Sequence, residues 1–552
     1  MAETVVYPAR SIVTMDPSQP VAEAVAVRDG RVLAVGTMDE CARWGDHTVD
    51  GSFADRVLVP GMIEAHAHVL EGVFSLLPYA GWFDRRRPDG TTVVGIRTYD
   101  DLVVLLRAEA DALSDPDQAL VVGGFDPIYF TGEERLSRRH LDQVSTTRPV
   151  FVLHASAHLA TVNSAMLVQS DITAATPTPG VHLGADGEPS GELHEMPAIA
   201  LAASGVAVLL ETMGDPEAIR ALGRMARNEG VTVVTDLGAS GAMNAGSQDL
   251  WRSVVDAEFP TRIHQYHLPA PLGGSGDWEA AAEQVALLMT GNTPHLATRG
   301  VKFVLDGSIQ GWTAAMGWPG YFTGTDHGQL LLPPEQLVEA MRPFHQRRIN
   351  VHTHCNGDLT IDLFIDAVED LLLEFPWLDH RHTVQHCQLT NAAQYRRMAK
   401  LGMCANIFAN HLWYWGDQHH DLTVGPERAR KMEACATAKR EGVRFALHTD
   451  ANVTPLGHRH SMWCAVNRVT PSGRVLGEHE RISAYDALKA VTLDAAYQQH
   501  LDHEMGTIEC GKLADFAVLG DSPLDVDPMD IRDIPVWGTV VGGVCHPGPD
   551  AT

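Results

Sequence analysis

INVHTHCNGDLTIDLFIDAVEDLLLEFPWLDHRHTVQHCQL, residues 349–389, carries a complete strand–helix–strand pattern. β-Branched and apolar residues dominate the short runs INVHTHC and HTVQHC, whereas LTIDLFIDAVEDLLLEF between them repeats apolar residues at helical spacing. Similar runs and helical stretches alternate from about residue 60 to about 500, for example VTVVTDLG, VKFVLDG and VRFALHTD. This alternation predicts a parallel sheet with crossover helices, and its many repeated units favour a closed barrel.

Both ends of the chain consist of short β-like segments. The N-terminal part contains VVYPARSIVTM, AVAVRDGRVLAVG and DRVLVPG, with Asp29–Gly30 as a hairpin turn signal. The part that begins at Gly506 contains TIECGKLADFAVLG and VWGTVVGGVCHPG. Because short strands need partners, we expect the two ends to pair into one small β domain. The predicted organisation is a β domain from residues 1–59 and 501–552 around a barrel of residues 60–500.

The composition excludes several classes of protein. The 552 residues include 41 Lys and Arg against 70 Asp and Glu, which gives a net charge of −29. Such a surface repels nucleic acid and anionic lipid. The eight cysteines are scattered without a CxxC pair, which suits a reducing compartment, and the N-terminus lacks the apolar core of a signal peptide. We therefore expect a cytoplasmic protein that acts on a small molecule, without nucleic-acid or membrane partners.

Several strand-like runs end on side chains that bind metal ions. His66 and His68 in PGMIEAHAH are two residues apart, and such residues in a strand point to the same face. His354, His386 and Asp450 lie at the ends of three later runs. Each motif alone is weak, but strand ends converge on one mouth of a barrel. Imidazoles and a carboxylate gathered there would suit Zn²⁺ or a similar divalent ion.

This ordered set resembles the amidohydrolase superfamily over nearly the whole chain. PGMIEAHAH matches the first-strand signature, with Glu64 where the family more often has Asp, and GTIECGKLADFAVL matches the segment that returns to the β domain. HLATVNSAML, DGEPSGELHE, VKFVLDGSIQ and HCNGD resemble the amidohydrolase 3 group, which includes N-substituted formamide deformylases. The resemblance implies a distorted (β/α)8 TIM barrel with a small β-sandwich built from both chain ends.

The resemblance also implies a set of metal ligands. For one or two Zn²⁺ or similar ions per chain, these are His66, His68, Lys302, His354, His386 and Asp450. Lys302 matches the position that can bridge two metals as a carboxylated lysine, since a carbamate is an anion whereas an ammonium would be repelled. The alternative is a single metal, with Lys302 paired to Asp306 or another acid. His352 is additional to the motif, and we expect it to have a structural role.

These residues predict hydrolysis of an amide-type C–N bond by metal-bound hydroxide, because a metal lowers the pKa of its water to about 7. Asp450 would orient the water, accept its proton and pass it to the leaving nitrogen. If the resemblance to the deformylases holds in detail, the products are formate and an amine. A cyclic-amide hydrolase or a deaminase on the same scaffold is the alternative. A non-catalytic binding protein is a second, less favoured alternative.

A long insertion around residues 75–215 separates His68 from the later strands, and we expect it to form a cap over the barrel mouth. His158, within this insertion, is predicted to donate to a substrate oxygen, with a core histidine of the cap as the alternative. Trp413 and Trp415, together with Trp312, are predicted to line an apolar pocket for a bulky substituent. The alternative is that these tryptophans pack between loop and cap. Barrels of this family often associate into oligomers, but the sequence does not determine whether this chain forms a homo-oligomer.

Overall fold

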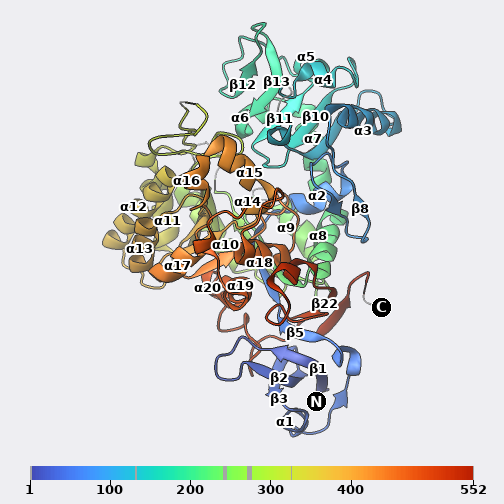
Figure 1. The fold of residues 1–552 in the computed structure, drawn as a ribbon, viewed down its shortest axis with the longest axis vertical. Helices are drawn as coiled ribbons and strands as arrows, with labels where there is room; N and C mark the ends of the chain where they lie inside the picture. The colour runs from blue at the N-terminus through green and yellow to red at the C-terminus, as the bar shows by residue number, and fades with distance from the viewer. Residues whose placement is uncertain (1–2, 131–133, 240–244, 270–275, 325, 551–552) are drawn as a thin grey trace.

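The computed structural model describes residues 3–130, 134–239, 245–269, 276–324 and 326–550. None of the helices formed by these residues has the length and apolar character needed to cross a membrane. Figure 1 shows three parts along the long axis of the molecule: a sheet built from the N-terminal and C-terminal strands at one end, a barrel in the middle and a second small sheet at the other end.

The barrel consists of eight parallel strands. In spatial order they are β6 (Met62–Ala67), β14 (Val231–Asp236), β15 (Arg262–His267), β16 (Leu296–Val304), β17 (Asn350–Cys355), β18 (Thr383–His386), β19 (Cys404–Ile407) and β20 (Phe445–Leu447). A parallel bridge between Ala67, at the end of β6, and Ala451, just after β20, links the first and last strands of this order. Across the same seam, the Glu64 carboxylate accepts hydrogen bonds from the N–H and the hydroxyl of Thr449, at 3.2 and 2.6 Å. The predicted (β/α)8 fold class is confirmed.

The stretch of residues 349–389 shows why these segments fold as they do. Every residue of β17 is buried, as expected for a parallel strand covered by helices on one face and by the barrel interior on the other. The next helix, α12 (Asp358–Glu374), buries Ile361, Phe364, Ile365, Val368 and Leu371, which share one helical face. That apolar face lies on the strands, and the opposite face is in water.

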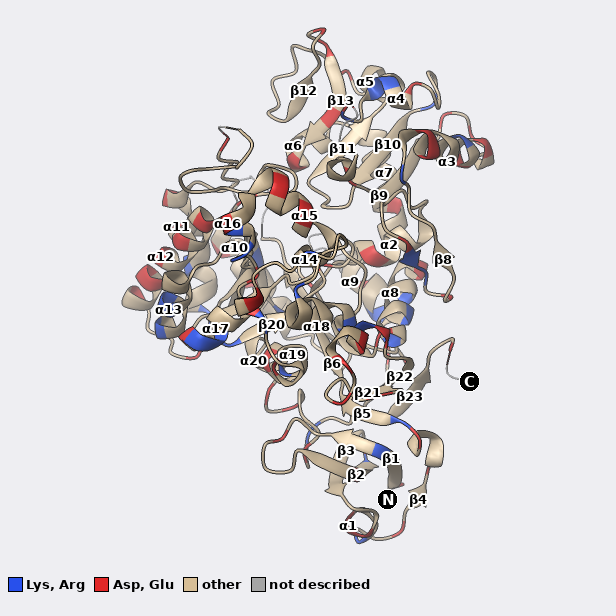
Figure 2. Ribbon diagram, in the orientation of Figure 1, with Lys and Arg blue, Asp and Glu red and all other residues tan. Residues whose placement is uncertain are grey.

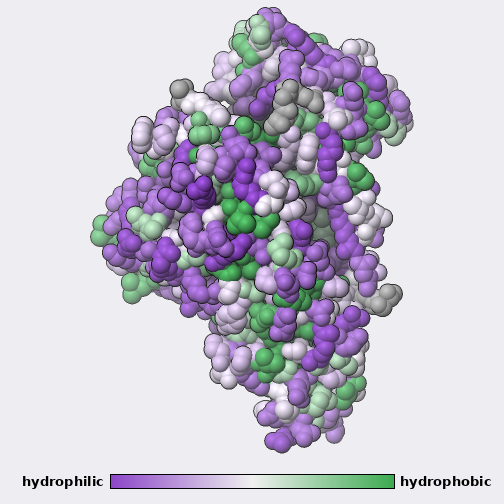
Figure 3. Space-filling model, viewed as in Figure 1, coloured by the Kyte–Doolittle hydropathy of each residue, from purple (hydrophilic) through white to green (hydrophobic). Residues whose placement is uncertain are grey.

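Helices connect the barrel strands on the outside. These are α8 (Pro216–Asn228), α9 (Ala245–Val254), α10 (Trp278–Met289), α11 (Pro334–Gln346), α12, α13 (Ala392–Leu401) and α17 (Cys435–Glu441), and after β20 come α18 (His458–Asn467), α19 (Ala484–Ala490) and α20 (Leu493–Gln498). Figure 2 shows Asp and Glu interspersed with Lys and Arg on these outer helices. Figure 3 shows the same face as largely hydrophilic, with smaller hydrophobic groups between. The apolar side chains therefore lie mainly between the helices and the barrel.

The two chain ends form one sheet, as predicted. Its strand order is β23 (Val544–Pro547), β22 (Val536–Val541), β21 (Phe516–Leu519), β5 (Val57–Pro60), β1 (Val5–Val13), β2 (Val21–Arg28) and β3 (Arg31–Gly36), with β4 (Thr48–Val49) beside β1. β21 pairs antiparallel with β5 and so joins the C-terminal strands to the N-terminal ones. Asp29 and Gly30 both have positive φ, 53° and 72°, as the tight hairpin between β2 and β3 requires.

The insertion folds around its own sheet. After α2 (Leu70–Leu76), the strands β9 (Leu120–Phe125), β10 (Val150–His154), β11 (Leu159–Val162), β12 (Val181–Leu183) and β13 (Pro189–His194) form a sheet of five. The helices α3 (Tyr99–Ala112), α5 (Ser164–Gln169), α6 (Glu195–Ile199) and α7 (Ala203–Met213) accompany it. In Figure 1 this sheet lies at the end of the molecule opposite the termini. The chain then returns to the barrel through α8.

Candidate metal centre at the barrel mouth

A cavity of about 930 Å³ lies at the carboxyl end of the barrel strands. Residues at or just beyond the ends of all eight strands line it, from His68 after β6 to Asp450 after β20. The insertion contributes further lining residues, which include His158 and Met196. In parallel barrels the loops after the strands converge at this end and carry the functional side chains. The cavity therefore lies where such a barrel would bind a small molecule.

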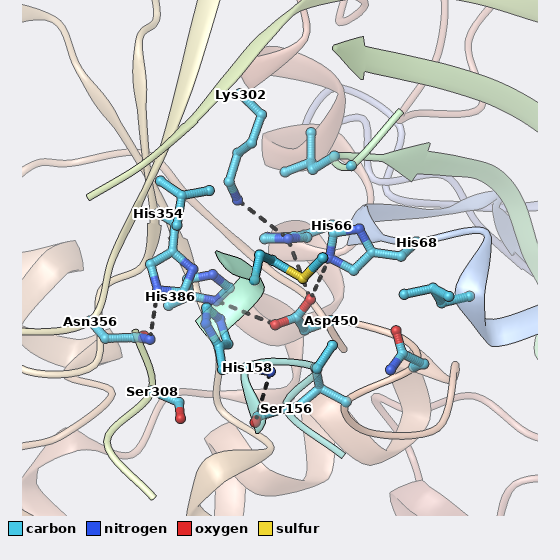
Figure 4. Close-up of a pocket in the computed structure, with 18 of the residues that line it drawn as sticks. His66, His68, Ser156, His158, Lys302, Ser308, His354, Asn356, His386 and Asp450 are labelled. Atoms are coloured by element: carbon cyan, nitrogen blue, oxygen red, sulfur yellow. Dashed lines mark hydrogen bonds and ion pairs between the residues drawn. The ribbon is translucent and has the colours of Figure 1, made fainter. Parts of the chain in front are cut away.

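His66, His68 and Asp450 form one compact group. His66 Nε2 lies 3.3 Å from Asp450 Oδ1, and His68 Nε2 lies 3.1 Å from the same oxygen. One ligand atom from each residue lies within 4.8 Å of the other two, and Figure 4 shows the three side chains converging. The period-two alternation of the strand places both imidazoles on one side, as predicted. Two nitrogens and an oxygen form a donor set suited to a divalent cation.

A second compact group joins His66 to His386 at the end of β18 and to His448 just after β20. His386 Nδ1 lies 3.1 Å from His448 Nε2. His386 Nε2 is buried and has no hydrogen-bond partner in the part of the chain that the structure describes. His386 also has φ 75°, a costly conformation for a non-glycine residue that occurs most often at functional sites. Sequence reasoning missed His448, although it precedes Asp450 by the same two residues that separate His66 and His68.

His354 and Lys302 line the same cavity, but neither belongs to the two compact groups found among the described residues. The His354 ring packs against His386 with centroids 4.5 Å apart, and its Nε2 lies 3.1 Å from the carbonyl oxygen of Gly307. Lys302 Nζ lies 3.4 Å from His66 Nε2. Burial lowers the pKa of Lys302 to about 7. The structure thus brings both predicted ligands to the edge of the centre.

Asp306, the alternative partner for Lys302, is engaged elsewhere. Its buried carboxylate accepts hydrogen bonds from the N–H groups of Ala315, Asn356 and Gly357 at 2.8–3.0 Å. Burial raises its pKa to about 7 although these hydrogen bonds oppose the rise. Asp306 therefore organises the loops after β16 and β17, which carry part of the cavity wall.

A buried glutamine fixes the orientation of the His66 ring. Gln385, on β18, accepts a hydrogen bond from His66 Nδ1 at 2.8 Å and another from Asn406 Nδ2 at 2.8 Å. Its own Nε2 donates to His352 Nδ1 at 2.7 Å. Because the Gln385 oxygen can only accept, His66 carries its proton on Nδ1 and presents the Nε2 lone pair to the cavity. His352 lies behind the centre, in keeping with the structural role expected for it.

The protonation states also suit a cation. Burial lowers the pKa of His66 and of His386 well below the usual value, so both are neutral, the form that binds metal. Burial would lower the pKa of His68 as well, but its contacts with Asp236 and Asp450 raise it to about 9. In the absence of a cation, a protonated His68 balances these carboxylates. A metal ion would take over that role and displace the proton.

The insertion brings one imidazole to this centre. His158 lines the cavity, and its ring centroid lies 5.5 Å from that of His354. Its Nδ1 lies 2.7 Å from Glu195 Oε2, and its carbonyl oxygen accepts the Glu195 N–H at 2.7 Å. Burial opposes protonation of His158, but Glu195 raises its pKa overall. His158 therefore lies near the predicted ligands, as a substrate-contacting residue must, and is not buried in the interior of the insertion.

The three tryptophans predicted to line a pocket do not line this cavity in the described part of the chain. Trp415 is buried and donates its Nε1–H to Asp126 Oδ2 of the insertion at 2.8 Å. Trp413 packs edge-on against Trp463, with ring centroids 5.3 Å apart. Trp312 lies beside Tyr321 with centroids 6.5 Å apart. Packing between the loop and the cap, the alternative prediction, is what the structure shows for Trp415, whereas Trp413 packs against α18 of the barrel.

The same segment supplies different residues to the cavity. Phe408 and His411 line it, and α14 (His411–Tyr414) begins directly after the loop that follows β19. Residues two apart on a helix point in nearly opposite directions, so a helix that turns His411 towards the cavity turns Trp413 away. His411 Nδ1 lies 2.9 Å from His419 Nε2, which holds the ring in place. Sequence reasoning found the segment but did not foresee this helical turn.

Comparison with known proteins agrees with this geometry. A model of the amidohydrolase family matches residues 54–546. The chain is 27% identical to Protein LONG AFTER FAR-RED 3 of Arabidopsis thaliana, covering 97% of this chain and 90% of that protein. It is 25% identical to an N-substituted formamide deformylase of Arthrobacter pascens, covering 96% of each. A solved structure of an uncharacterized metal-dependent hydrolase from Pyrococcus horikoshii OT3 shares the fold, with a TM-score of 0.71, 18% identity and coverage of 95% of this chain and 99% of that one.

Proposed function

The chain belongs to the amidohydrolase family, whose members are metal-dependent hydrolases, and on this basis we propose that it cleaves an amide-type C–N bond in a small molecule. The observation that carries the proposal is the gathering of His66, His68, His386, His448 and Asp450 at the barrel mouth. Four imidazoles and a carboxylate that converge beside one cavity have a clear use as metal ligands.

The donor set fits Zn²⁺ or a similar divalent ion. His66, His68 and Asp450 would hold one ion, since their ligand atoms lie within 4.8 Å of one another. His386, whose buried Nε2 lacks a partner among the described residues, would hold a second together with the adjacent His354. When bound there, such an ion would lower the pKa of a water molecule and polarise a carbonyl group.

Lys302 would complete a two-ion site as a carbamate. The ammonium would first lose a proton, and the neutral amine would then add carbon dioxide with loss of a second proton, which leaves a bidentate anion in place of the cation. An ammonium 3.4 Å from His66 Nε2 would oppose a metal ion at that nitrogen, whereas a carbamate would be a ligand. With a single ion, Lys302 would instead remain an amine at the cavity wall.

Two groups of the chain would move protons during hydrolysis. Asp450 faces His66 and His68, where its carboxylate can orient a water molecule, accept its proton and pass it to the leaving nitrogen. His158 is held at Nδ1 by Glu195, which leaves Nε2 to donate to a substrate oxygen. Glu195 acts only through His158 in this scheme and is a positioning residue.

The substrate class that we favour is N-substituted formamides or related N-acyl compounds. It is supported by the relative named N-substituted formamide deformylase, which matches over 96% of both chains. A formamide would yield formate and an amine. Hydrolysis of a cyclic amide and deamination of a base, which use the same scaffold, are the alternative reactions, and the experiment below measures both.

Metal analysis and a substrate panel test the proposal together. Protein purified without chelators is analysed by plasma mass spectrometry, and then incubated with an N-substituted formamide, a cyclic amide and an aminopyrimidine while formate, ring opening and ammonia are measured. We expect one or two metal equivalents and formate release. Asp450→Asn should abolish turnover, whereas Asp521→Asn, an exposed control, should retain it. A chain without metal that stays inactive after addition of zinc, manganese or cobalt would contradict the proposal and favour a binding protein.

A further inference from the structure

The cavity has two chemically different halves. After the adjacent strands β16, β17 and β18, its wall carries uncharged polar side chains: Ser308, Gln310, Asn356 and Gln388. After the adjacent strands β6, β14 and β15, it carries apolar ones: Leu70, Leu237, Leu268 and Pro269. Because each set comes from neighbouring strands, the two sets lie on different sides of the barrel mouth. The metal-type ligands lie between them.

The polar half offers oxygen atoms without partners. Ser308 Oγ, Gln310 Oε1, Asn356 Oδ1 and Gln388 Oε1 are buried, and none accepts a hydrogen bond from any residue that the structure describes. Each of these residues is at most 5% exposed. A buried polar atom left unpaired costs about 1–3 kcal/mol, so four on one wall favour a ligand that supplies donors. Figure 4 shows Ser308 and Asn356 on the same side of the site as His354.

The insertion extends the apolar half. Met196, Pro197 and Ala200, on and just after the short helix α6, line the cavity. Met196 is 38% exposed, so part of its side chain is free to contact a ligand in the cavity. These side chains add to the apolar ones after β6, β14 and β15, and a wall of this composition suits a hydrocarbon or aryl group.

Anionic partners for a substrate are missing from both halves in the described part of the chain. Apart from imidazoles, the ionisable lining residues described are Lys302 and Asp450, and both lie within the candidate metal centre. A cationic substituent outside that centre would lose water without gaining a counter-ion, which is strongly unfavourable.

From this division we infer that the substrate is a molecule without a cationic group that carries an apolar substituent on one side of the scissile bond and a hydrogen-bond-donating group on the other. Carboxamides and alcohols have such groups, whereas amino acids and polyamines do not fit. The inference rests on the proposed function, because it places the scissile bond at the metal centre. It adds which groups must flank that bond.

Binding of hydroxamic acids tests this inference without turnover. Three para-substituted phenylacetohydroxamic acids, with methyl, carbamoyl and aminomethyl groups, are titrated calorimetrically into the metal-loaded protein at neutral pH. We expect the methyl and carbamoyl probes to bind and the cationic aminomethyl probe to bind at least about 30-fold more weakly. Equal affinities for the carbamoyl and aminomethyl probes would overturn the inference and leave the proposed function intact. Failure of every hydroxamate to bind would overturn both.

Paired variants separate the two halves. Gln388→Leu should weaken binding of the carbamoyl probe about tenfold and leave binding of the methyl probe unchanged. Met196→Ser should weaken binding of the methyl probe about fivefold and leave binding of the carbamoyl probe unchanged. General damage to the fold would weaken both probes in both variants, which would count against the assignment. Gln388→Glu should instead strengthen the aminomethyl probe about tenfold, because it supplies the missing counter-ion. The exposed residues Gln118 and Leu183 provide the controls Gln118→Leu and Leu183→Ser.

Discussion

Replacing Gln385 by leucine should weaken metal binding without touching a predicted metal ligand. Leucine is close to glutamine in size, so the buried site stays filled, but the hydrogen bonds to His66, His352 and Asn406 are lost. These bonds measure 2.7–2.8 Å and lie among side chains that are inaccessible to water. Without the acceptor at its Nδ1, His66 can rotate or shift its proton to Nε2, the nitrogen that faces the cavity.

The size of the effect follows from these contacts. Loss of a hydrogen-bond partner behind a metal-binding histidine typically reduces metal affinity about 10–100-fold, or about 1.4–2.8 kcal/mol. The three groups left unpaired should also lower the free energy of unfolding of the metal-free protein by about 2–4 kcal/mol. Gln385→Glu keeps an acceptor for His66 but removes the donor to His352, so its zinc affinity should lie between those of the leucine variant and the wild type.

Competition between the protein and a chromophoric zinc chelator measures the affinity, and urea unfolding of the metal-free protein measures stability separately. Gln394→Leu is the matched control. Gln394 is buried on α13 and makes comparable hydrogen bonds, to the Asn391 N–H at 3.0 Å and the Asp358 carbonyl at 2.9 Å, but it does not line the cavity. This control should lose stability and keep its zinc affinity. Equal zinc affinities for Gln385→Leu and Gln394→Leu would refute the reasoning.

Three further predictions concern other parts of the molecule. Asp515→Ala should lower the free energy of unfolding by about 3–5 kcal/mol in urea, because it leaves a buried arginine of β15 unpaired, whereas Asp521→Ala at an exposed ion pair should cost under about 1 kcal/mol. Glu195→Gln should reduce kcat about tenfold or more, with KM and metal content nearly unchanged, because His158 loses the carboxylate that holds and charges it; an unchanged kcat would remove both from the mechanism. Burial lowers the pKa of His380 to about 4, so the unfolded chain takes up this proton first, and His380 should account for about 1.6 kcal/mol of the fall in stability between pH 6.5 and pH 5; His380→Asn should make the fall smaller by that amount, while other buried histidines, such as His154 and His458, keep their share.

Sequence alone was sufficient for the fold and for much of the candidate site. Buried β-branched runs that alternate with amphipathic helices predict a parallel barrel, because each element must bury one face against the other. Strand periodicity also places His66 and His68 on one side, and barrel geometry brings Asp450 to the same mouth. The pairing of the two chain ends followed from their short strands, which need partners to form a stable sheet.

Tertiary structure decided which atoms meet. The contact between His386 and His448 depends on how β18, β19 and β20 are staggered, which the local sequence does not encode. The hydrogen bond from His66 to Gln385 joins residues 319 positions apart. Trp413 faces away from the cavity because a helical turn starts at His411, whereas Trp415 packs against the His411 ring and donates to Asp126 of the insertion. The apolar wall of α6 comes from an insertion folded around its own sheet. Periodicity indicates which side of an element is buried, but the partner of each buried atom is set by long-range packing.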